Sequence, residues 1–153
     1  MICVPKVDTD IFVDAPVDAC WEIGADMERY PEFFPSVDEV KITERGENWT
    51  VTEWSGKLQG RRLKWVERDE FDEERGTITY DQISGDLKVF RGQWSFEEEG
   101  EGCRVRLTIE ASLGIPMLEA ALNPLLRKVI RDNGNSMLKG LKKEAERNRT
   151  ADA

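Results

Sequence analysis

Three side chains in the middle of the chain have the chemistry expected of a reactive site: Glu67, Asp69 and Tyr80. Glu67 and Asp69 are two residues apart on a predicted strand, so their carboxyl groups point to one side about 7 Å apart. Two carboxyl groups at that spacing suit proton transfer on one substrate, and the Tyr80 phenol is a further weak acid. The alternative is that both carboxylates lie near strand ends, in water at the mouth of a pocket.

The chain contains no histidine, which narrows the chemistry further. Catalysis by Ser-His-Asp or Cys-His pairs is excluded, and so are histidine-bearing metal sites. Proton transfer would use carboxylates, Tyr, Arg, Lys, Cys or water, and we expect no metal and no cofactor. Cys3, Cys20 and Cys103 are odd in number and form no CxxC pair, which favours reduced thiols.

Aromatic residues recur on the same side of the predicted strands as the two carboxyl groups. By alternation, the inward positions are Trp49, Trp65, Tyr80, Phe90 and Trp94, with Gln82 beside them and Trp54 facing outward. These side chains either pack as an ordinary core or line a pocket for a flat ligand by stacking and edge contacts. A carboxyl group buried there would either pair with Arg61, Arg62 or Arg91, or act as a proton donor or acceptor.

The elements that position these residues follow from hydrophobic periodicity. Seven runs alternate with a period of two and are separated by turn residues, which predicts an antiparallel meander. The runs cover residues 6–14, 37–45, 49–56, 63–71, 78–84, 87–96 and 103–113. Pro16 begins a short helix after the first run, and a second short helix follows in the segment that Pro31 and Pro35 interrupt.

The C-terminal segment has helical periodicity instead. Leu126 and Ile130 belong to its apolar stripe, and Asn123 followed by Pro124 is a typical helix start. The pattern predicts a short helix before Asn123, a long helix over 124–147 and a disordered tail over 150–153. The whole pattern, a long sheet with one long helix, is typical of an α+β fold.

A chain of 153 residues fits a single domain, over 1–153, that buries about 69% of its surface on folding. One helix leaves part of the concave side of such a sheet uncovered, so the pattern predicts a mostly apolar internal pocket. An empty void of ~500 Å³ would cost on the order of 12 kcal/mol, close to the stability of a whole domain. The space is therefore either filled by aromatic side chains or occupied by water or ligand. Gly134 and Gly140 in the long helix either pack closely against the sheet or keep that space open.

The net charge of the chain is −9. This charge disfavours nucleic acid and anionic membrane surfaces, because both repel a negative protein at long range. The N-terminal residues show no signal-peptide pattern, and no apolar run approaches the ~20 residues of a membrane span. We therefore expect a cytoplasmic protein that binds a hydrophobic small molecule, without nucleic acid and without membrane insertion. The sequence leaves the oligomeric state open.

Four segments carry a resemblance to a known superfamily. They are 15–21 (APVDACW), 26–33 (DMERYPEF), 90–96 (FRGQWSF) and 138–142 (LKGLK). Together they resemble the START-like (SRPBCC) superfamily, and within it the polyketide cyclase/dehydrase and coenzyme Q-binding branch. The resemblance implies a helix-grip fold, in which a curved seven-stranded antiparallel sheet wraps around the C-terminal helix. It also implies a hydrophobic ligand in the cavity, although this superfamily serves several functions.

The resemblance also adds residues to the predicted site. Tyr30 and Phe34 match aromatic positions of the first helices in this superfamily, and its cyclases use an arginine where Asp69 stands here and a tyrosine where Val37 stands. The predicted ligand contacts are therefore Tyr30, Phe34, Trp49, Trp65, Tyr80, Gln82, Phe90, Trp94, Leu126 and Ile130.

Three functions are consistent with these features. A carrier or binding protein for a lipid, quinone or polyketide-like compound needs only the cavity, and this is the function we expect. A polyketide cyclase/dehydrase (aromatase) acting on a poly-β-ketone is the alternative, and it would use Glu67, Asp69 or Tyr80 with a cationic partner. An interaction role would use an exposed apolar patch around Trp54.

Overall fold

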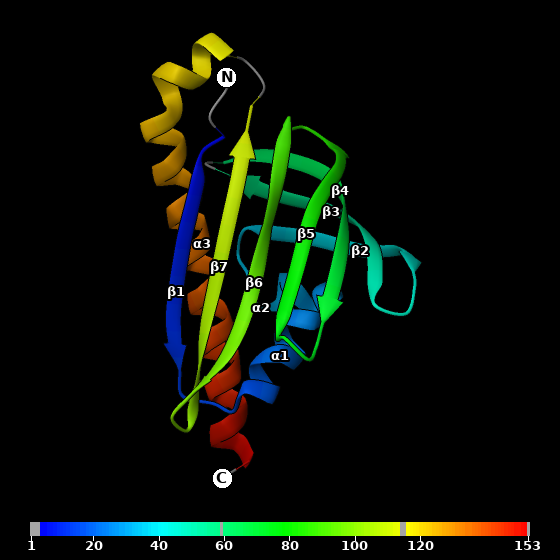
Figure 1. The fold of residues 1–153 in the computed structure, drawn as a ribbon, viewed down its shortest axis with the longest axis vertical. Helices are drawn as coiled ribbons and strands as arrows, with labels where there is room; N and C mark the ends of the chain where they lie inside the picture. The colour runs from blue at the N-terminus through cyan, green and yellow to red at the C-terminus, as the bar shows by residue number, and fades with distance from the viewer. Residues whose placement is uncertain (1–3, 59, 114–115, 153) are drawn as a thin grey trace.

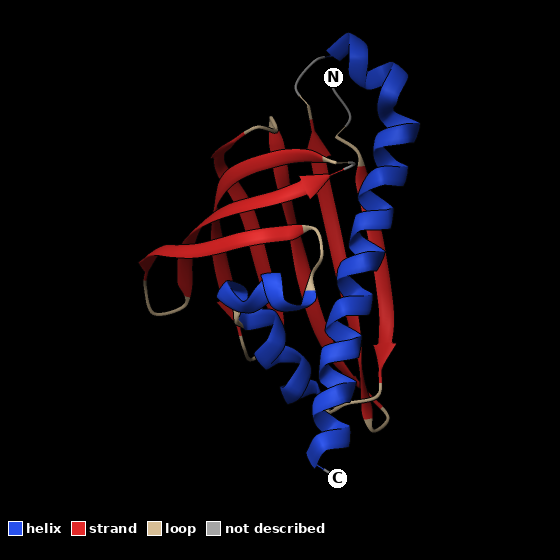
Figure 2. Cartoon of the chain, turned by 180° about the vertical axis from the view of Figure 1, so that it is seen from behind, coloured by secondary structure: helices blue, strands red, loops and turns tan. Residues whose placement is uncertain are grey.

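A seven-stranded antiparallel sheet curves around one long helix (Figures 1 and 2). The computed structural model describes residues 4–58, 60–113 and 116–152. The strands are β1 (Lys6–Val13), β2 (Val37–Arg45), β3 (Trp49–Leu58), β4 (Arg61–Asp72), β5 (Thr77–Gly85), β6 (Val89–Glu99) and β7 (Gly102–Ser112). The helices are α1 (Val17–Ala25), the 3-10 turn η1 (Met27–Arg29), α2 (Tyr30–Phe33) and α3 (Pro116–Asp152). The predicted α+β helix-grip architecture is confirmed.

The strand order in the sheet is β1-β7-β6-β5-β4-β3-β2, with every neighbouring pair antiparallel. Six of the strands therefore form the predicted meander, and β1 closes the open side of β7. The alternation in β7 explains its orientation, because Val105, Leu107 and Ile109 are buried while Arg104 and Arg106 lie on the other face. The short helices α1 and α2 cover the end of the concave side near the β4–β5 turn (Figure 2).

The predicted phase of β3 is wrong by one residue. Trp54 is directly opposite Trp65 on β4, and Thr52 is opposite Glu67, so these residues share the inner face. Trp49 and Glu53 are consequently on the outer face, where Glu53 is exposed. The reason is that the inner face of β3 carries threonines, which look like solvent positions in the sequence but bind a buried carboxylate.

The C-terminal segment is one continuous helix. Pro124 lies inside α3 and does not divide it, in contrast to the predicted break before Asn123. Proline removes one backbone donor and displaces the preceding turn, and in many helices this produces a bend and not an end. The helix also continues to Asp152, beyond the predicted end at Arg147, so the tail predicted from residue 150 is helical through Asp152.

Two glycines in α3 mark close contacts with the rest of the molecule. A Cβ atom at Gly134 would lie 3.2 Å from the Thr9 hydroxyl of β1. At Gly140 it would lie 2.2 Å from the backbone oxygen of Phe33, which belongs to α2. The explanation by close packing is therefore correct for both positions, although Gly140 packs against a helix instead of the sheet.

Cys20 on α1 and Cys103 on β7 are buried, free and hydrogen-bonded to each other. The hydrogen bond with Cys103, and then burial, raise the pKa of Cys20 far above its usual value. The same hydrogen bond lowers the pKa of Cys103. The predicted reduced state agrees with these two free thiols, and Cys3 lies outside the described residues. Within the described ranges, α3 and the shorter helices are all too short or too polar to cross a membrane.

Candidate ligand cavity with a buried carboxyl pair

A cavity lies between the concave face of the sheet and α3, and Tyr30 of α2 contributes to its wall. Its volume is about 110 Å³, which is below the ~300–1,000 Å³ of typical ligand pockets. Aromatic side chains therefore fill much of the concave space. The remaining volume suits a guest of about one aromatic ring, since a cavity of ~150 Å³ holds benzene. A larger guest requires movement of flexible lining residues such as Leu126 and Met137 on α3.

The wall of the cavity is a connected set of aromatic rings. Trp54 and Trp65 stack with ring centroids 5.5 Å apart and an interplanar angle of 12°. Phe90 contacts Trp65 edge-on at 5.3 Å and Tyr80 at 5.5 Å. Tyr30 contacts the other side of the set, in an edge-to-face arrangement with Trp54 whose ring centroids are 5.5 Å apart. Such a wall favours flat guests, because stacking and edge contacts add to the burial of apolar area.

Glu67 supplies a carboxyl group to this apolar wall. It lines the cavity, and only 3% of its surface is exposed. The indole N–H of Trp65 donates to Glu67 Oε1 at 2.8 Å. Within the described part of the chain Glu67 forms no salt bridge. Arg91, one of its predicted partners, pairs with Glu110 on the outer face instead. The pairing of Glu67 with Arg91 that the sequence left open is therefore not formed, and Arg61 and Arg62 are exposed.

Asp69 lies behind Glu67 and is fully buried. Its Oδ2 accepts hydrogen bonds from the hydroxyls of Thr52 at 2.7 Å and Thr50 at 3.0 Å. The Thr52 hydroxyl in turn accepts a hydrogen bond from the indole N–H of Trp54 at 2.6 Å. Two hydroxyls of β3 thus hold Asp69 of β4, and the register of the two strands places these threonines directly opposite the two acids.

We assign one shared proton to Glu67 and Asp69, because two neighbouring buried carboxyl groups form a hydrogen bond only when one of them is protonated. Burial raises the pKa of Glu67 well above its usual range, and a hydrogen bond with Asp69 raises it further. Burial also raises the pKa of Asp69, although hydrogen bonds from Glu67, Thr52 and Thr50 oppose this rise. Because the hydroxyls stabilise the negative form of Asp69, we assign the proton to Glu67 and the charge to Asp69. The cavity thus borders a neutral carboxylic acid backed by a carboxylate.

The two tyrosines of the cavity are neutral phenols with backbone partners. The Tyr30 hydroxyl donates to the Gly24 carbonyl at 2.5 Å, and the Tyr80 hydroxyl donates to the Thr108 carbonyl at 3.0 Å. Burial raises the pKa of both phenols well above the usual value. Their rings line the cavity, while their hydroxyls hold α1 and β7 in place. Tyr80 is therefore better suited to shaping the wall than to moving protons.

The structure brings most of the predicted site residues together. Those lining the cavity are Tyr30, Trp65, Glu67, Tyr80, Phe90, Trp94, Leu126 and Ile130. Asp69 does not line it and acts on it only through Glu67.

Three predicted ligand contacts lie elsewhere. Trp49 is on the outer face of β3, where the Arg68 guanidinium sits 4.4 Å from its ring centroid. Phe34 is buried behind the wall, stacked on Trp94 at 6.1 Å. Gln82 is turned toward the β5–β6 connection, where its amide donates to the Leu87 carbonyl at 2.7 Å. For these residues the alternation or the resemblance gave the correct region but not the correct side of it.

Sequence reasoning missed several residues that line the cavity, namely Met27, Trp54, Leu63, Ala111, Asn133 and Met137. For Trp54 a signal was present in the sequence. Leu58 pairs with Arg61, which is the spacing of a two-residue hairpin. Counting one residue at a time along both strands away from this pair places Trp54 opposite Trp65. The others sit at strand ends or on helices, where periodicity gives the buried face without saying which part of it stays unfilled.

A curved sheet that grips a long helix around an apolar cavity defines the chain as a START-like helix-grip protein. More narrowly, the chain belongs to the polyketide cyclase/dehydrase and lipid transport family, whose family model matches residues 13–138. This membership supports either polyketide cyclase chemistry or hydrophobic ligand binding.

Known proteins agree with this membership. The chain is similar to the actinorhodin polyketide synthase bifunctional cyclase/dehydratase of Streptomyces coelicolor, with 29% identity over 87% of this chain and 42% of the relative. The chain thus spans less than half of that relative. A crystal structure from Thermus thermophilus has a TM-score of 0.86 and 29% identity, covering 92% of this chain and 97% of that one. The Zhui aromatase/cyclase from a Streptomyces species has the same TM-score of 0.86 at 24% identity, covering 95% of each chain, which shows a shared fold.

Proposed function

We propose that the protein binds a small, flat hydrophobic molecule, of the polyketide-like or aromatic kind, in the cavity between the sheet and α3. The observation that carries this proposal is the wall of contiguous rings around Trp54, Trp65 and Phe90, interrupted by one carboxylic acid. A wall of this kind gives affinity through the apolar area and orientation through its polar group. With its proton directed to Asp69, Glu67 keeps lone pairs that can accept a hydrogen bond from a ligand hydroxyl.

The test is a titration with aromatic alcohols of one and two rings, followed by tryptophan fluorescence. Trp54, Trp65 and Trp94 line the cavity, so a guest there should change their emission. Native mass spectrometry of freshly purified protein adds an independent measurement of any co-purifying ligand. Absence of a co-purifying ligand, together with no response to either alcohol, would contradict the proposal.

A filling variant shows whether the response comes from the cavity. Ala111 is buried and lines it, so Ala111→Leu should occupy part of the free volume. We expect it to weaken binding of the one-ring alcohol by more than tenfold while the melting temperature is retained, because added methyl groups are tolerated where a void exists. The control is Glu53→Gln on the exposed outer face, which should bind as the wild type does.

A second candidate function, cyclisation and dehydration of a poly-β-ketone, is supported by the shared proton of Glu67 and Asp69. In aldol closure the carbonyl oxygen would take the proton of Glu67 as the carbon–carbon bond forms. The attacking enol would return its hydroxyl proton to the pair, so that the pair ends as it began. The aromatic wall would hold the chain folded in the meantime.

The measurement is turnover of a poly-β-ketone analogue by wild type and by the isosteric variants Glu67→Gln and Asp69→Asn. We expect both variants to lose turnover and to keep binding of the aromatic alcohol. If both retain turnover, the cyclase function is wrong, whereas the binding function is tested separately by the titration.

A further inference from the structure

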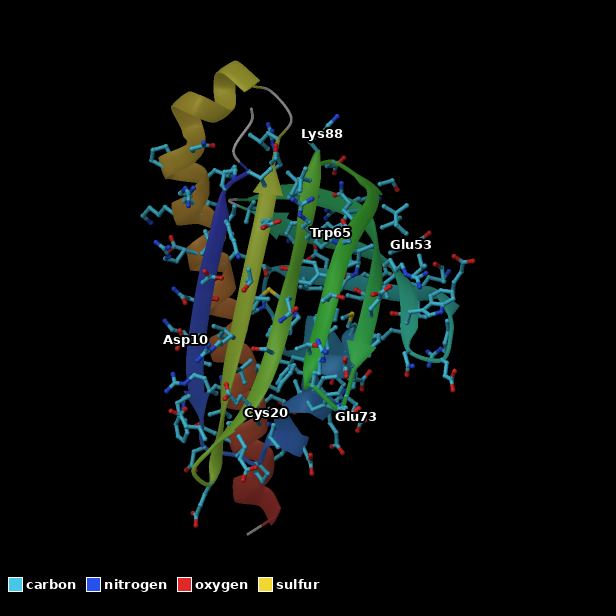
Figure 3. The ribbon with its side chains drawn as sticks, viewed as in Figure 1. Asp10, Cys20, Glu53, Trp65, Glu73 and Lys88 are labelled. Atoms are coloured by element: carbon cyan, nitrogen blue, oxygen red, sulfur yellow. The ribbon has the colours of Figure 1, made fainter. Side chains whose placement is uncertain are left out.

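The charges of the protein are separated along its length. One end carries the exposed basic residues of the β3–β4 hairpin and the β5–β6 connection, which we call the basic mouth. It consists of Lys57, Arg61, Arg62, Lys64 and Lys88. Figure 3 shows Lys88 at this end of the sheet and Glu73 at the other end. Two hydrogen bonds join the two connections: the Lys64 N–H donates to the Asp86 carboxylate at 2.8 Å, and the Asp86 N–H donates to the Lys64 carbonyl at 3.1 Å.

Four acidic side chains lie beside the base of the basic mouth, since Glu39 and Glu53 line one surface hollow together with Lys64 and Asp86, and Asp38 is near Lys57. Asp38 lies 3.9 Å from the Lys57 ammonium, which is a weak exposed contact. Asp86 is engaged by the Lys64 backbone N–H. Among the described residues, Arg61, Arg62 and Lys88 form no ion pair.

The opposite end of the molecule is strongly acidic. It contains the β4–β5 turn and the tip of the β6–β7 hairpin, with exposed Asp72, Glu73, Glu74, Glu97, Glu98, Glu99 and Glu101. The β7 strand of 11 residues that links the two ends spans about 36 Å. At physiological ionic strength the screening length is about 8 Å. An anionic surface at the basic mouth therefore interacts with the basic residues nearby and hardly with the distant acids, despite the net charge of −9.

The cavity opens at the same end. Leu58, Leu63 and Leu87 are half-buried cavity residues beside the basic mouth, and Leu113 at the end of β7 is 37% exposed. These leucines form an apolar rim between the basic side chains and the cavity. An apolar rim surrounded by lysine and arginine fits a surface that offers both hydrocarbon and negative charge.

We propose that the basic mouth and its leucine rim dock on an anionic lipid membrane. The basic side chains contact lipid phosphates, and the rim enters the boundary between headgroups and acyl chains. The acidic end faces away from the membrane, so the charge separation also orients the protein. In this orientation the cavity faces the lipid, and a hydrophobic guest passes between them without crossing water. Docking of this kind is peripheral and requires no membrane-spanning segment.

The test is cosedimentation with vesicles of phosphatidylcholine alone and with vesicles in which roughly a third of the lipid is phosphatidylglycerol. The first variant, Arg61→Gln/Arg62→Gln, removes two charges from an exposed hairpin. The matched control, Arg45→Gln/Arg75→Gln, removes two charges from exposed positions away from the mouth. Both double variants have the same net charge, so a difference between them reports position.

We expect binding of the wild type to the anionic vesicles only, weakening as salt is added. Each basic residue at an anionic surface contributes about fivefold to binding, so the mouth variant should bind about 25-fold more weakly. The control should bind as the wild type does. Equal losses in both variants, equal binding to neutral vesicles, or no vesicle binding at all would overturn the proposal. The last result, combined with retention on an immobilised acidic protein, would assign the basic mouth to a protein partner instead. Vesicle binding needs no guest in the cavity, so its outcome is independent of the ligand titration.

Discussion

Trp54 and Trp65 stack across the β3–β4 pair, and their indole N–H groups reach the two members of the acidic pair. The Trp65 N–H donates directly to Glu67, whereas the Trp54 N–H donates to Thr52, which donates to Asp69. The same two rings therefore build the apolar wall and hold its polar group. This coupling explains how a carboxyl pair persists in the core without a cation, because each member has donors and one proton is shared.

The first prediction concerns the donor to Asp69. Thr52→Val keeps the shape of the side chain and removes the hydroxyl, which leaves charged Asp69 short of one hydrogen bond and the Trp54 N–H without its acceptor. We expect the free energy of unfolding at neutral pH to fall by about 1.5–3 kcal/mol, and the loss to shrink in acid, where Asp69 is protonated. Denaturant unfolding at several pH values measures both effects. Thr43→Val is the control, because its hydroxyl donates to the Val51 carbonyl at the surface, and a pH-independent loss at Thr52 would contradict the assignment.

The second prediction is a pH dependence of stability caused by Glu67. Its pKa is raised by burial above the ordinary value of 4.5, so above pH 4.5 the unfolded chain loses this proton before the folded chain does. The unfolded state then binds fewer protons, and stability falls as pH rises through this window, by up to about 1.4 kcal/mol per pH unit for one proton. Glu67→Gln cannot ionise and should flatten this slope in denaturant titrations. The exposed variant Glu53→Gln should keep the slope of the wild type, and equal slopes in all three proteins would show that Glu67 is not buried as a neutral acid.

Much of this fold could be predicted from the sequence. The alternation of β7 and the turn residues between runs determine the meander, and the apolar stripe through Ile130 determines the buried face of α3. These signals are strong because each depends on many residues with one period. The segment around Pro31 added the resemblance from which the helix-grip arrangement was inferred.

The errors in the site have local physical causes. Thr50 and Thr52 face inward, where their hydroxyls donate to Asp69. Because threonine resembles a solvent-facing residue in the sequence, the predicted phase of β3 is shifted by one residue, and Trp49 and Trp54 are assigned to the wrong faces. Pro124 lies inside α3 in spite of the loss of one backbone hydrogen bond. In β3, a tertiary contact decides between two local patterns of similar strength. The sequence left open whether aromatic side chains fill the concave space, since periodicity does not show how far aromatic rings fill a concave face.

The third prediction tests which tryptophans contact a guest. Trp65→Ala removes part of the wall and the donor to Glu67, so we expect aromatic alcohols to bind at least tenfold more weakly. Trp49→Ala removes a ring of similar size on the outer face, beneath Arg68, and should leave their affinity unchanged. Isothermal titration measures both affinities without relying on tryptophan emission. Loss of binding in Trp49→Ala alone would mean that the guest lies on the outer face of the sheet.

The fourth prediction concerns the contact between α2 and α3 that closes the cavity on the side of Tyr30. A Cβ atom at Gly140 would lie 2.2 Å from a backbone oxygen, whereas at Gly134 the nearest atom would be a side-chain hydroxyl at 3.2 Å. Alanine stabilises a helix by about 1 kcal/mol relative to glycine. This gain is the same at both positions, so a difference in stability between the two variants reports the crowding at each. Gly140→Ala should lower the free energy of unfolding by about 1–3 kcal/mol, because backbone must move to admit the methyl group.

Gly134→Ala should be close to neutral, since the small displacement that it needs offsets the gain in propensity. Thermal and denaturant unfolding of the two variants side by side provide the comparison. Equal stabilisation in both would show that α2 does not hold α3 at Gly140. A large loss confined to Gly140→Ala would instead establish that the packing of α2 on α3 fixes the position of the wall formed by Tyr30, and with it the volume left for a guest.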